Sequence, residues 1–299
     1  MTAPEEEKLQ GPSVNSIDQE ALRCLMDADP YIKKRLTGQT NVALGENQNR
    51  FNYRQEVWND NPVQFHNGRV TYLDLSGHRI KKLPSEPFQS LTKLETLNLG
   101  GTDIPVTQLL AAIQGCMRSL RQLFLGGNGL RNVGFVSLVE GVLSKEINKL
   151  QKLDVRYNDI GPQGVVALSK ILGKDKCPIE FLYMEGNEIG DEGARALSDC
   201  LQNNNACLKE IFLGANRIGV EGARAFAKAI ETNKSLTKLY LEGNRIGEEG
   251  GAALTAALLT WKGEAPLKKL FVDNNGIGKE QSEQLAKALN SESIIGGVC

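Results

Sequence analysis

Hydrophobic and polar positions alternate in one pattern that recurs along most of the chain. Its clearest copy runs from Leu236 to Ile246 and has the form L-x-x-L-x-L-x-x-N-x-I. The alternation at Leu239 and Leu241 predicts a short β-strand that buries both leucines and turns Tyr240 to the opposite face.

The pattern has eight copies, whose starting points are 24 to 31 residues apart. They begin at Val70, Leu94, Leu120, Leu150, Ile179, Leu208, Leu236 and Leu267. After the strand comes Ile-Gly and then alanine and leucine at helical spacing, as in Ile189 to Leu197. Internal similarity with this period predicts a leucine-rich repeat solenoid of the α/β class, with a strand and a helix in each full repeat.

The ninth position of the pattern is asparagine from the third copy onward. The residues at this position are His78, Thr102, Asn128, Asn158, Asn187, Asn216, Asn244 and Asn275. A buried asparagine can both donate and accept hydrogen bonds, so it can pair backbone groups where the chain turns out of the strand. We therefore predict that these asparagines are structural.

The repeats from Leu120 onward extend to L-x-x-L-x-L-x-x-N-x-I-G-x-x-G. In this form they resemble the ribonuclease-inhibitor-like subfamily of leucine-rich repeats, which includes repeat regions of NOD-like receptors and Ran GTPase-activating proteins. The resemblance implies a horseshoe over residues 70–290, with a concave parallel sheet and convex helices. The first repeat is shorter and resembles those of plant and protist proteins. Its Pro84 and Pro87 disfavour a full helix.

The segments outside the repeats predict a cap and two ends. Residues 1–15 are polar and are expected to be disordered. We interpret residues 16–69 as an N-terminal cap over the exposed flank of the first repeat, anchored by Trp58, with a separate functional domain as the alternative. Residues 291–299 form a short C-terminal tail.

A helix is predicted at the start of this cap. Ser16 can cap it, and Asp29-Pro30 ends it. One face of this helix is expected to be buried, and it carries Ile17, Ala21, Leu22 and Leu25.

Charge and cysteine content restrict the partners. The chain has 35 basic and 36 acidic side chains, a net charge of −1, so we expect neither nucleic acid nor a membrane as partner. No apolar run approaches the roughly 18 residues of a transmembrane helix. Six scattered cysteines with no C-x-x-C pair and no signal peptide indicate reduced thiols, and hence a cytoplasmic or nuclear protein.

The motifs of catalysis and cofactor binding are missing from the sequence. Gly126-Gly127-Asn128-Gly129 is not followed by the Gly-Lys-Ser/Thr of a phosphate loop. The two histidines, His66 and His78, suggest neither a catalytic set nor a zinc site. Acidic residues recur where helices begin, which the helix dipole explains. We predict no enzyme activity, no cofactor and no metal.

The position between the two strand leucines faces away from the core. It is aromatic in five of eight repeats: Phe124, Tyr183, Phe212, Tyr240 and Phe271. Neighbouring strands lie about 4.8 Å apart, so the last four rings should form a continuous exposed ladder on the concave face. Phe124 lies beyond a gap at Asp154.

Two further columns flank this row of rings. The position on one side carries Lys152, Phe181, Glu210, Lys238 and Lys269. The position on the other side carries Arg156, Glu185, Gly214, Glu242 and Asp273. Pairing between neighbouring strands alone could explain such columns. The alternative is an interface, because aromatic anchors dominate binding energy. We predict a protein-binding site made of Phe124, Phe181, Tyr183, Phe212, Tyr240, Phe271, Arg156, Lys238, Lys269, Glu242 and Asp273.

Three functions remain open at this point. The first is a non-enzymatic module that binds a protein partner through its concave face. The second is a structural subunit of a large multi-protein assembly, held by its ends, its cap or its convex helices. The third, a GTPase-activating protein of the Ran type, comes from the family resemblance alone.

Overall fold

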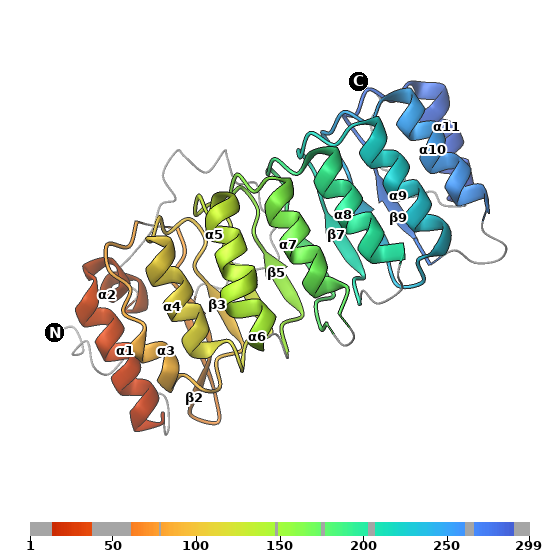
Figure 1. Ribbon diagram of the computed structural model, residues 1–299. Coiled ribbons are helices and arrows are strands. Elements are labelled where there is room, and N and C mark those ends of the chain that lie inside the picture. Colours follow the sequence, from red (N-terminus) through yellow and green to blue (C-terminus); the bar gives the residue numbers. More distant parts are fainter. Residues whose placement is uncertain are drawn as a thin grey trace. The chain divides into compact units, whose positions relative to one another are not determined.

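The computed structural model describes residues 14–37, 61–77, 79–146, 149–174, 177–202, 207–260 and 266–289 (Figure 1). Contacts within the chain divide it into two compact units, Met1–Leu120 and Arg121–Cys299. Within each unit, neighbouring strands follow one another in chain order, and helices alternate with them along most of the chain. The predicted α/β repeat solenoid is confirmed.

The first unit begins with two helices and a hairpin. Its helices are α1 (Ser16–Ala28), α2 (Pro30–Leu36), α3 (Glu86–Ser90) and α4 (Val106–Cys116). Its strands are β1 (Val63–His66), β2 (Arg69–Asp74) and β3 (Thr96–Asn98). Strand β1 pairs with β2 in antiparallel fashion, and β2 pairs with β3 in parallel. Helix α3 packs between α1 and α4, and it is as short as Pro84 and Pro87 predict.

The cap helix differs in detail from the prediction. Helix α1 ends before Asp29 as predicted, but Asn15 rather than Ser16 caps it, through Oδ1 at 2.9 Å from the backbone nitrogen of Ile17. The expected burial of Ile17 is wrong, since 56% of this residue is exposed. Asp18 is fully buried in its place, because it binds Arg69 and the backbone of β2.

Other elements before the first repeat were not predicted. Asp29 ends α1 and also caps α2, accepting a hydrogen bond from the backbone of Tyr31 at 2.8 Å. Helix α2 and strand β1 are therefore additional regular elements of this segment. Trp58, the predicted anchor of the cap, lies outside the described residues.

The second unit carries the regular repeats. Its strands are β4 (Gln122–Phe124), β5 (Lys152–Asp154), β6 (Phe181–Tyr183), β7 (Glu210–Phe212), β8 (Lys238–Tyr240) and β9 (Lys269–Phe271), and successive strands pair in parallel. Its helices are α5 (Arg131–Leu138), the π-helix η3 (Val139–Leu143), α6 (Ser144–Glu146), α7 (Pro162–Leu172), α8 (Gly190–Gln202), α9 (Val220–Thr232), α10 (Gly247–Thr260) and α11 (Lys279–Ala288). The helices cover one face of the sheet (Figure 1). The leucines of the strands are buried between the sheet and the helix layer.

The asparagines of the second unit form a ladder along the turns that leave the strands, as predicted. Each of them is buried, and its Nδ2 donates to backbone carbonyls of its own turn, of the preceding repeat, or of both. The backbone nitrogen of Asn216 in turn donates to Oδ1 of Asn244 at 2.9 Å. Each repeat therefore supplies hydrogen bonds that the turn of the repeat before it requires.

The second glycine of the I-G-x-x-G motif allows neighbouring helices to pack closely. A methyl group on Gly222 would lie 2.6 Å from Cγ2 of Ile218 and 3.0 Å from Cβ of Ala194 in the preceding helix. A methyl group on Gly164 or Gly250 would likewise lie 2.9 Å from a side chain of the preceding helix, Phe135 or Ala223, whereas one on Gly193 would lie 3.4 Å from Val165. The motif therefore records a steric requirement of the helix layer.

We expect Gly222→Ala to lower the free energy of unfolding by about 1–3 kcal/mol, the usual range for an overpacked core. Chemical denaturation followed by circular dichroism would measure it. Gly141→Ala is the matched control, because a methyl group on Gly141 would meet nothing within 4 Å. The explanation is wrong if the two variants unfold at the same denaturant concentration.

Among the described residues, no helix is both long enough and apolar enough to span a membrane.

Candidate functional site

The aromatic side chains between the strand leucines stack in one row. The parallel register aligns Tyr183 with Phe212, Phe212 with Tyr240, and Tyr240 with Phe271. Successive ring centroids lie 4.3, 4.0 and 4.4 Å apart, with interplanar angles of 13°, 12° and 6°. We call the sheet face that carries these four rings the ladder face; it is the predicted concave face, opposite the helices of the second unit.

The expectation that these rings are exposed is wrong in part. Tyr240 and Phe271 are 7% and 8% exposed and Phe124 is 5% exposed, whereas Tyr183 and Phe212 are half-buried. Stacking alone does not set the exposure of a ring, since Phe212 stacks on both Tyr183 and Tyr240 and is still half-buried. Tyr183 and Phe212 are therefore the accessible part of the row.

Arg156 fills the predicted gap at Asp154. Its Nε and Nη2 donate to Oδ1 and Oδ2 of Asp154 at 3.0 and 2.6 Å. The guanidinium carbon lies 5.2 Å from the ring centroid of Tyr183, within the range of a cation–π interaction. Asp154 stands between Phe124 and Tyr183 in the register. The row of rings therefore continues as a guanidinium held by a buried carboxylate.

The column that carries Lys152, Lys238 and Lys269 is here called the basic column. Part of its positive charge is already neutralised within the sheet. Nζ of Lys238 lies 2.8 Å from Oε1 of Glu210, its neighbour on β7. Nζ of Lys152 lies 5.7 Å from the ring centroids of both Phe181 and Tyr183. Phe181, Lys238 and Lys269 are half-buried. These side chains line one border of the ladder face.

The column that carries Glu185, Glu242 and Asp273, here called the acidic column, lines the other border of the ladder face. Backbone hydrogen bonds of 2.8–2.9 Å join its coils, from Gly186 to the carbonyl of Gly214, from Ala215 to that of Glu242, and from Gly243 to that of Asp273. The predicted residues Glu242 and Asp273 are half-buried there. Glu185 lies in the same column but was not among the predicted site residues.

The carboxyl group of Glu185 is electrostatically unusual. The pKa of this carboxyl is raised to about 7, chiefly by burial; Arg156 acts to lower it, and Asp154 and Glu242 act to raise it. Burial also raises the pKa of Asp273. Position in the acidic column was the sequence signal for Glu185, but its burial depends on neighbours that only the fold brings together.

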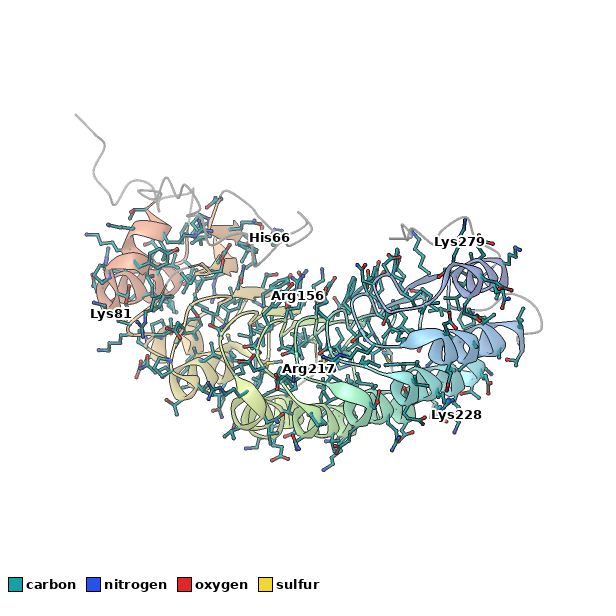
Figure 2. The ribbon with its side chains drawn as sticks, turned by 90° about the horizontal axis from the view of Figure 1, so that it is seen from above. His66, Lys81, Arg156, Arg217, Lys228 and Lys279 are labelled. Carbon is teal, nitrogen blue, oxygen red and sulfur yellow. The ribbon has the colours of Figure 1, made fainter. Side chains whose placement is uncertain are left out.

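Figure 2 labels Arg156 on the strand side of the second unit and Lys228, which belongs to α9, on the helix side. Lys228 is exposed and distant from the columns described above. The charged columns of the ladder face are therefore separate from the charges of the helix layer.

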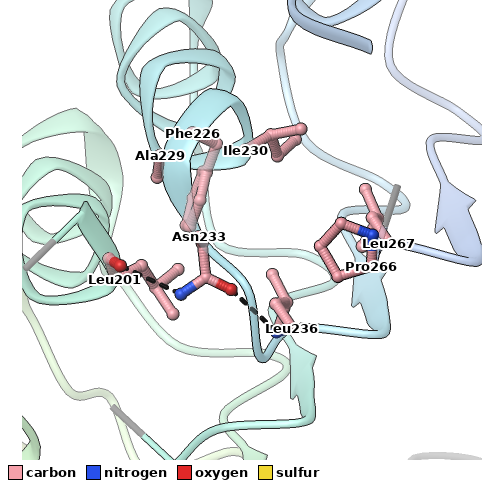
Figure 3. Close-up of a pocket in the computed structure, with 8 residues that line it drawn as sticks. All are labelled: Leu201, Phe226, Ala229, Ile230, Asn233, Leu236, Pro266 and Leu267. Carbon is pink, nitrogen blue, oxygen red and sulfur yellow. Dashed lines mark hydrogen bonds between the residues drawn. The ribbon is translucent and has the colours of Figure 1, made fainter. Parts of the chain in front are cut away.

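The second unit also contains a hollow, which belongs to the core (Figure 3). It is lined by Leu201, Phe226, Ala229, Ile230, Asn233, Leu236, Pro266 and Leu267. Its one polar side chain is used by the fold, because Nδ2 of Asn233 donates to the carbonyl of Leu201 at 2.9 Å and Oδ1 accepts from the backbone of Leu236 at 2.7 Å. We regard it as a packing gap between repeats.

The described residues were compared with the requirements of a metal site, and two buried thiols have shifted pKa values. Within that part, no group of three or more His, Cys, Asp or Glu side chains is placed to hold a metal ion. Burial raises the pKa of the Cys116 and Cys200 thiols to about 12 and about 11. Both thiols therefore stay protonated near neutral pH.

Comparison with known families agrees with the repeat architecture. A family model described as leucine rich repeat matches residues 68–130. A second model of the same description matches residues 147–169, 176–198, 204–227 and 232–254. The chain is a leucine-rich repeat protein, a class whose members generally act as protein-interaction modules. No curated protein matches it at a significant level.

Several solved structures are similar to this chain in part. The leucine-rich repeat-containing protein LegL7 from Legionella pneumophila is 16% identical, with a TM-score of 0.47 over 73% of this chain and 71% of that one. Actin-binding site 2 of leiomodin-1 is 17% identical, with a TM-score of 0.43 over 52% of this chain and 86% of that one. A chain of the yeast Rad7 and Elc1 complex is 15% identical, with a TM-score of 0.43 over 69% of this chain and 58% of that one.

Proposed function

We propose that this protein is a non-enzymatic protein-binding module of the ribonuclease-inhibitor-like type, and that its ladder face binds the partner. The observation that carries the proposal is the row of stacked rings from Tyr183 to Phe271 between two charged columns. Such a surface combines aromatic anchors with charges that orient a partner. A cytoplasmic or nuclear location belongs to the proposal and can be tested with a fluorescent fusion.

The accessible rings provide the test. We expect Tyr183→Ala combined with Phe212→Ala to weaken partner binding by about 2 kcal/mol or more, roughly thirtyfold, as at an interface hot spot. Affinity purification from the native source, with mass spectrometry of the captured proteins, would compare wild type and variant. Binding of the recovered partner would then be measured by calorimetry.

A matched control uses apolar residues of the helix layer. Val133 on α5 and Leu259 on α10 are 82% and 68% exposed. Val133→Ala with Leu259→Ala should leave a partner of the ladder face bound. Circular dichroism would check that all variants are folded. Equal capture by wild type and the Tyr183/Phe212 variant would refute the proposal.

The same two exposed side chains favour a second candidate, a structural subunit of a large assembly held through its helices. That function requires loss of partners from the Val133/Leu259 variant and their retention by the Tyr183/Phe212 variant. It also requires a native complex larger than 32.7 kDa on size-exclusion chromatography. GTPase activation stays a prediction from family resemblance, which an assay of GTP hydrolysis with small GTPases would test.

A further inference from the structure

We infer that two copies of this protein associate through β9, whose free edge pairs in antiparallel fashion with β9 of the second copy about a two-fold axis. The inference goes beyond the proposed function, because it concerns contact between copies of the chain. Three observations carry it: a strand edge that faces no further described strand, an apolar flank that stays partly exposed, and charges that complement themselves when the strand is reversed.

Strand β9 is the last strand of the described sheet. Its Phe271 directs its backbone groups toward β8, where its carbonyl accepts from the backbone nitrogen of Leu241 at 2.8 Å. Successive residues of a strand direct their N–H and C=O groups to opposite edges, so those of Leu270 and Val272 point to the free edge. Among the described residues, no further strand lies there to pair with them.

The last repeat also leaves part of its apolar flank exposed. Ile277 and Leu289 are half-buried. Their equivalents in the four preceding repeats are all buried: Ile160, Ile189, Ile218 and Ile246 for the first, and Leu172, Leu201, Ile230 and Leu258 for the second. A two-fold axis perpendicular to the sheet keeps the helices of both copies on one side, so the second copy would bring its own α11 beside this flank.

The charges around Phe271 match a reversed copy of the same strand. Lys269 and Asp273 lie two residues before and two residues after Phe271, and all three belong to the ladder face. When Phe271 stands opposite Phe271 of the second copy, Lys269 of each copy stands opposite Asp273 of the other. Both charged side chains are half-buried, and neither forms an ion pair within the described part of the chain. Two copies in parallel would instead set lysine against lysine.

The backbone groups favour the same register. Antiparallel strands alternate pairs that exchange two hydrogen bonds with pairs that exchange none. Phe271 uses its backbone groups toward β8, so it suits the pair on the axis, which exchanges none. Leu270 then stands opposite Val272 of the second copy, and both have groups at the free edge. Phe271 is only 8% exposed, so the backbone and the charges, rather than this ring, provide the contact.

Charge reversal tests the inference. We expect the wild-type chain to sediment as a reversible dimer of 32.7 kDa chains in analytical ultracentrifugation. Lys269→Asp and Asp273→Lys each set like charges against each other twice, so each should raise the dissociation constant of the dimer about tenfold or more. The double variant restores opposite charges and should recover the wild-type constant. Lys228→Asp, a charge reversal on the exposed surface of α9, should have no effect.

Mixing the single variants distinguishes the pairing from a folding defect. Equal amounts of Lys269→Asp and Asp273→Lys should form a heterodimer, because every charged pair then joins opposite charges. Amide hydrogen exchange locates the contact: the amides of Leu270 and Val272 should exchange more slowly as the wild-type concentration rises.

Three results would overturn the inference: a wild-type chain that stays monomeric throughout the concentration series, a dimer that Lys269→Asp does not weaken, or a mixture of the single variants that forms no heterodimer. Its failure is distinguishable from that of the proposed function. The Tyr183/Phe212 variant should dimerise like wild type, and Lys269→Asp can lose the dimer while the effect of Tyr183 and Phe212 on partner capture is unchanged.

Discussion

Replacing Asn216 with leucine is expected to lower the free energy of unfolding by about 3–5 kcal/mol, since each buried backbone group left unpaired costs about 1–3 kcal/mol. Asn216 is fully buried. Its Nδ2 donates to the carbonyls of Met184 and Gly214 at 2.9 and 3.1 Å, and its Oδ1 lies 3.5 Å from the backbone nitrogen of Ile189. Leucine fills the volume but pairs none of these groups.

Chemical denaturation followed by circular dichroism would measure the loss. Asn216→Thr is an informative second variant, because Thr102 stands at the same position of an earlier repeat and donates from Oγ1 to the carbonyl of Leu99 at 2.8 Å. Threonine keeps one donor, so it should cost less than leucine. If Asn216→Leu unfolds at the wild-type denaturant concentration, the asparagine ladder does not stabilise the turns.

This ladder also shows why the repeats could be predicted from sequence. Each repeat buries the same positions and pairs the same backbone groups, so one physical requirement recurs at every copy. In one repeat, for example, the buried Leu239 and Leu241 define the strand, and Asn244 pairs the backbone of the turn that follows. The end of α1 was predictable for a similarly local reason, because Asp29 precedes proline.

The cap was predictable only where its interactions are local. Asp18 is buried because its partners, Arg69 and Val70, lie about fifty residues later in the chain. Helical periodicity favours burial of the apolar Ile17 and contains nothing about those partners. Strand β1 depends in the same way on its pairing with β2.

The candidate site was likewise predictable from sequence only in part. Period-two alternation placed the aromatic rings in one row, and their stacking follows from the parallel register. Their burial was not predictable from the column alone, because rings of the same column differ in exposure once the fold surrounds them. The pairing of Lys238 with Glu210 and the enclosure of Glu185 likewise depend on side-chain conformations.

Replacing Asp18 with alanine is expected to destabilise the first unit by about 3–5 kcal/mol, the usual cost of breaking a buried ion pair from one side. Oδ2 of Asp18 accepts from the backbone nitrogen of Val70 at 2.7 Å and from Nε of Arg69 at 3.0 Å. Oδ1 lies 3.0 Å from Nη2 of Arg69. Alanine leaves a buried N–H and a largely buried guanidinium without this carboxylate. Chemical denaturation would measure the total loss, and amide hydrogen exchange would locate it in α1 and β2.

Glu20→Ala is the matched control, because Glu20 lies on the same helix in an exposed pair with Arg23 and should contribute little. Arg69→Ala in the Asp18→Ala background separates the two parts of the effect. If the unpaired guanidinium dominates, the double variant should be no less stable than Asp18→Ala, since the orphaned charge is gone. If the Val70 N–H dominates, Asp18→Asn should recover most of the stability, because its amide oxygen still accepts. Wild-type stability of Asp18→Ala would mean that this ion pair does not fasten the cap to the repeats.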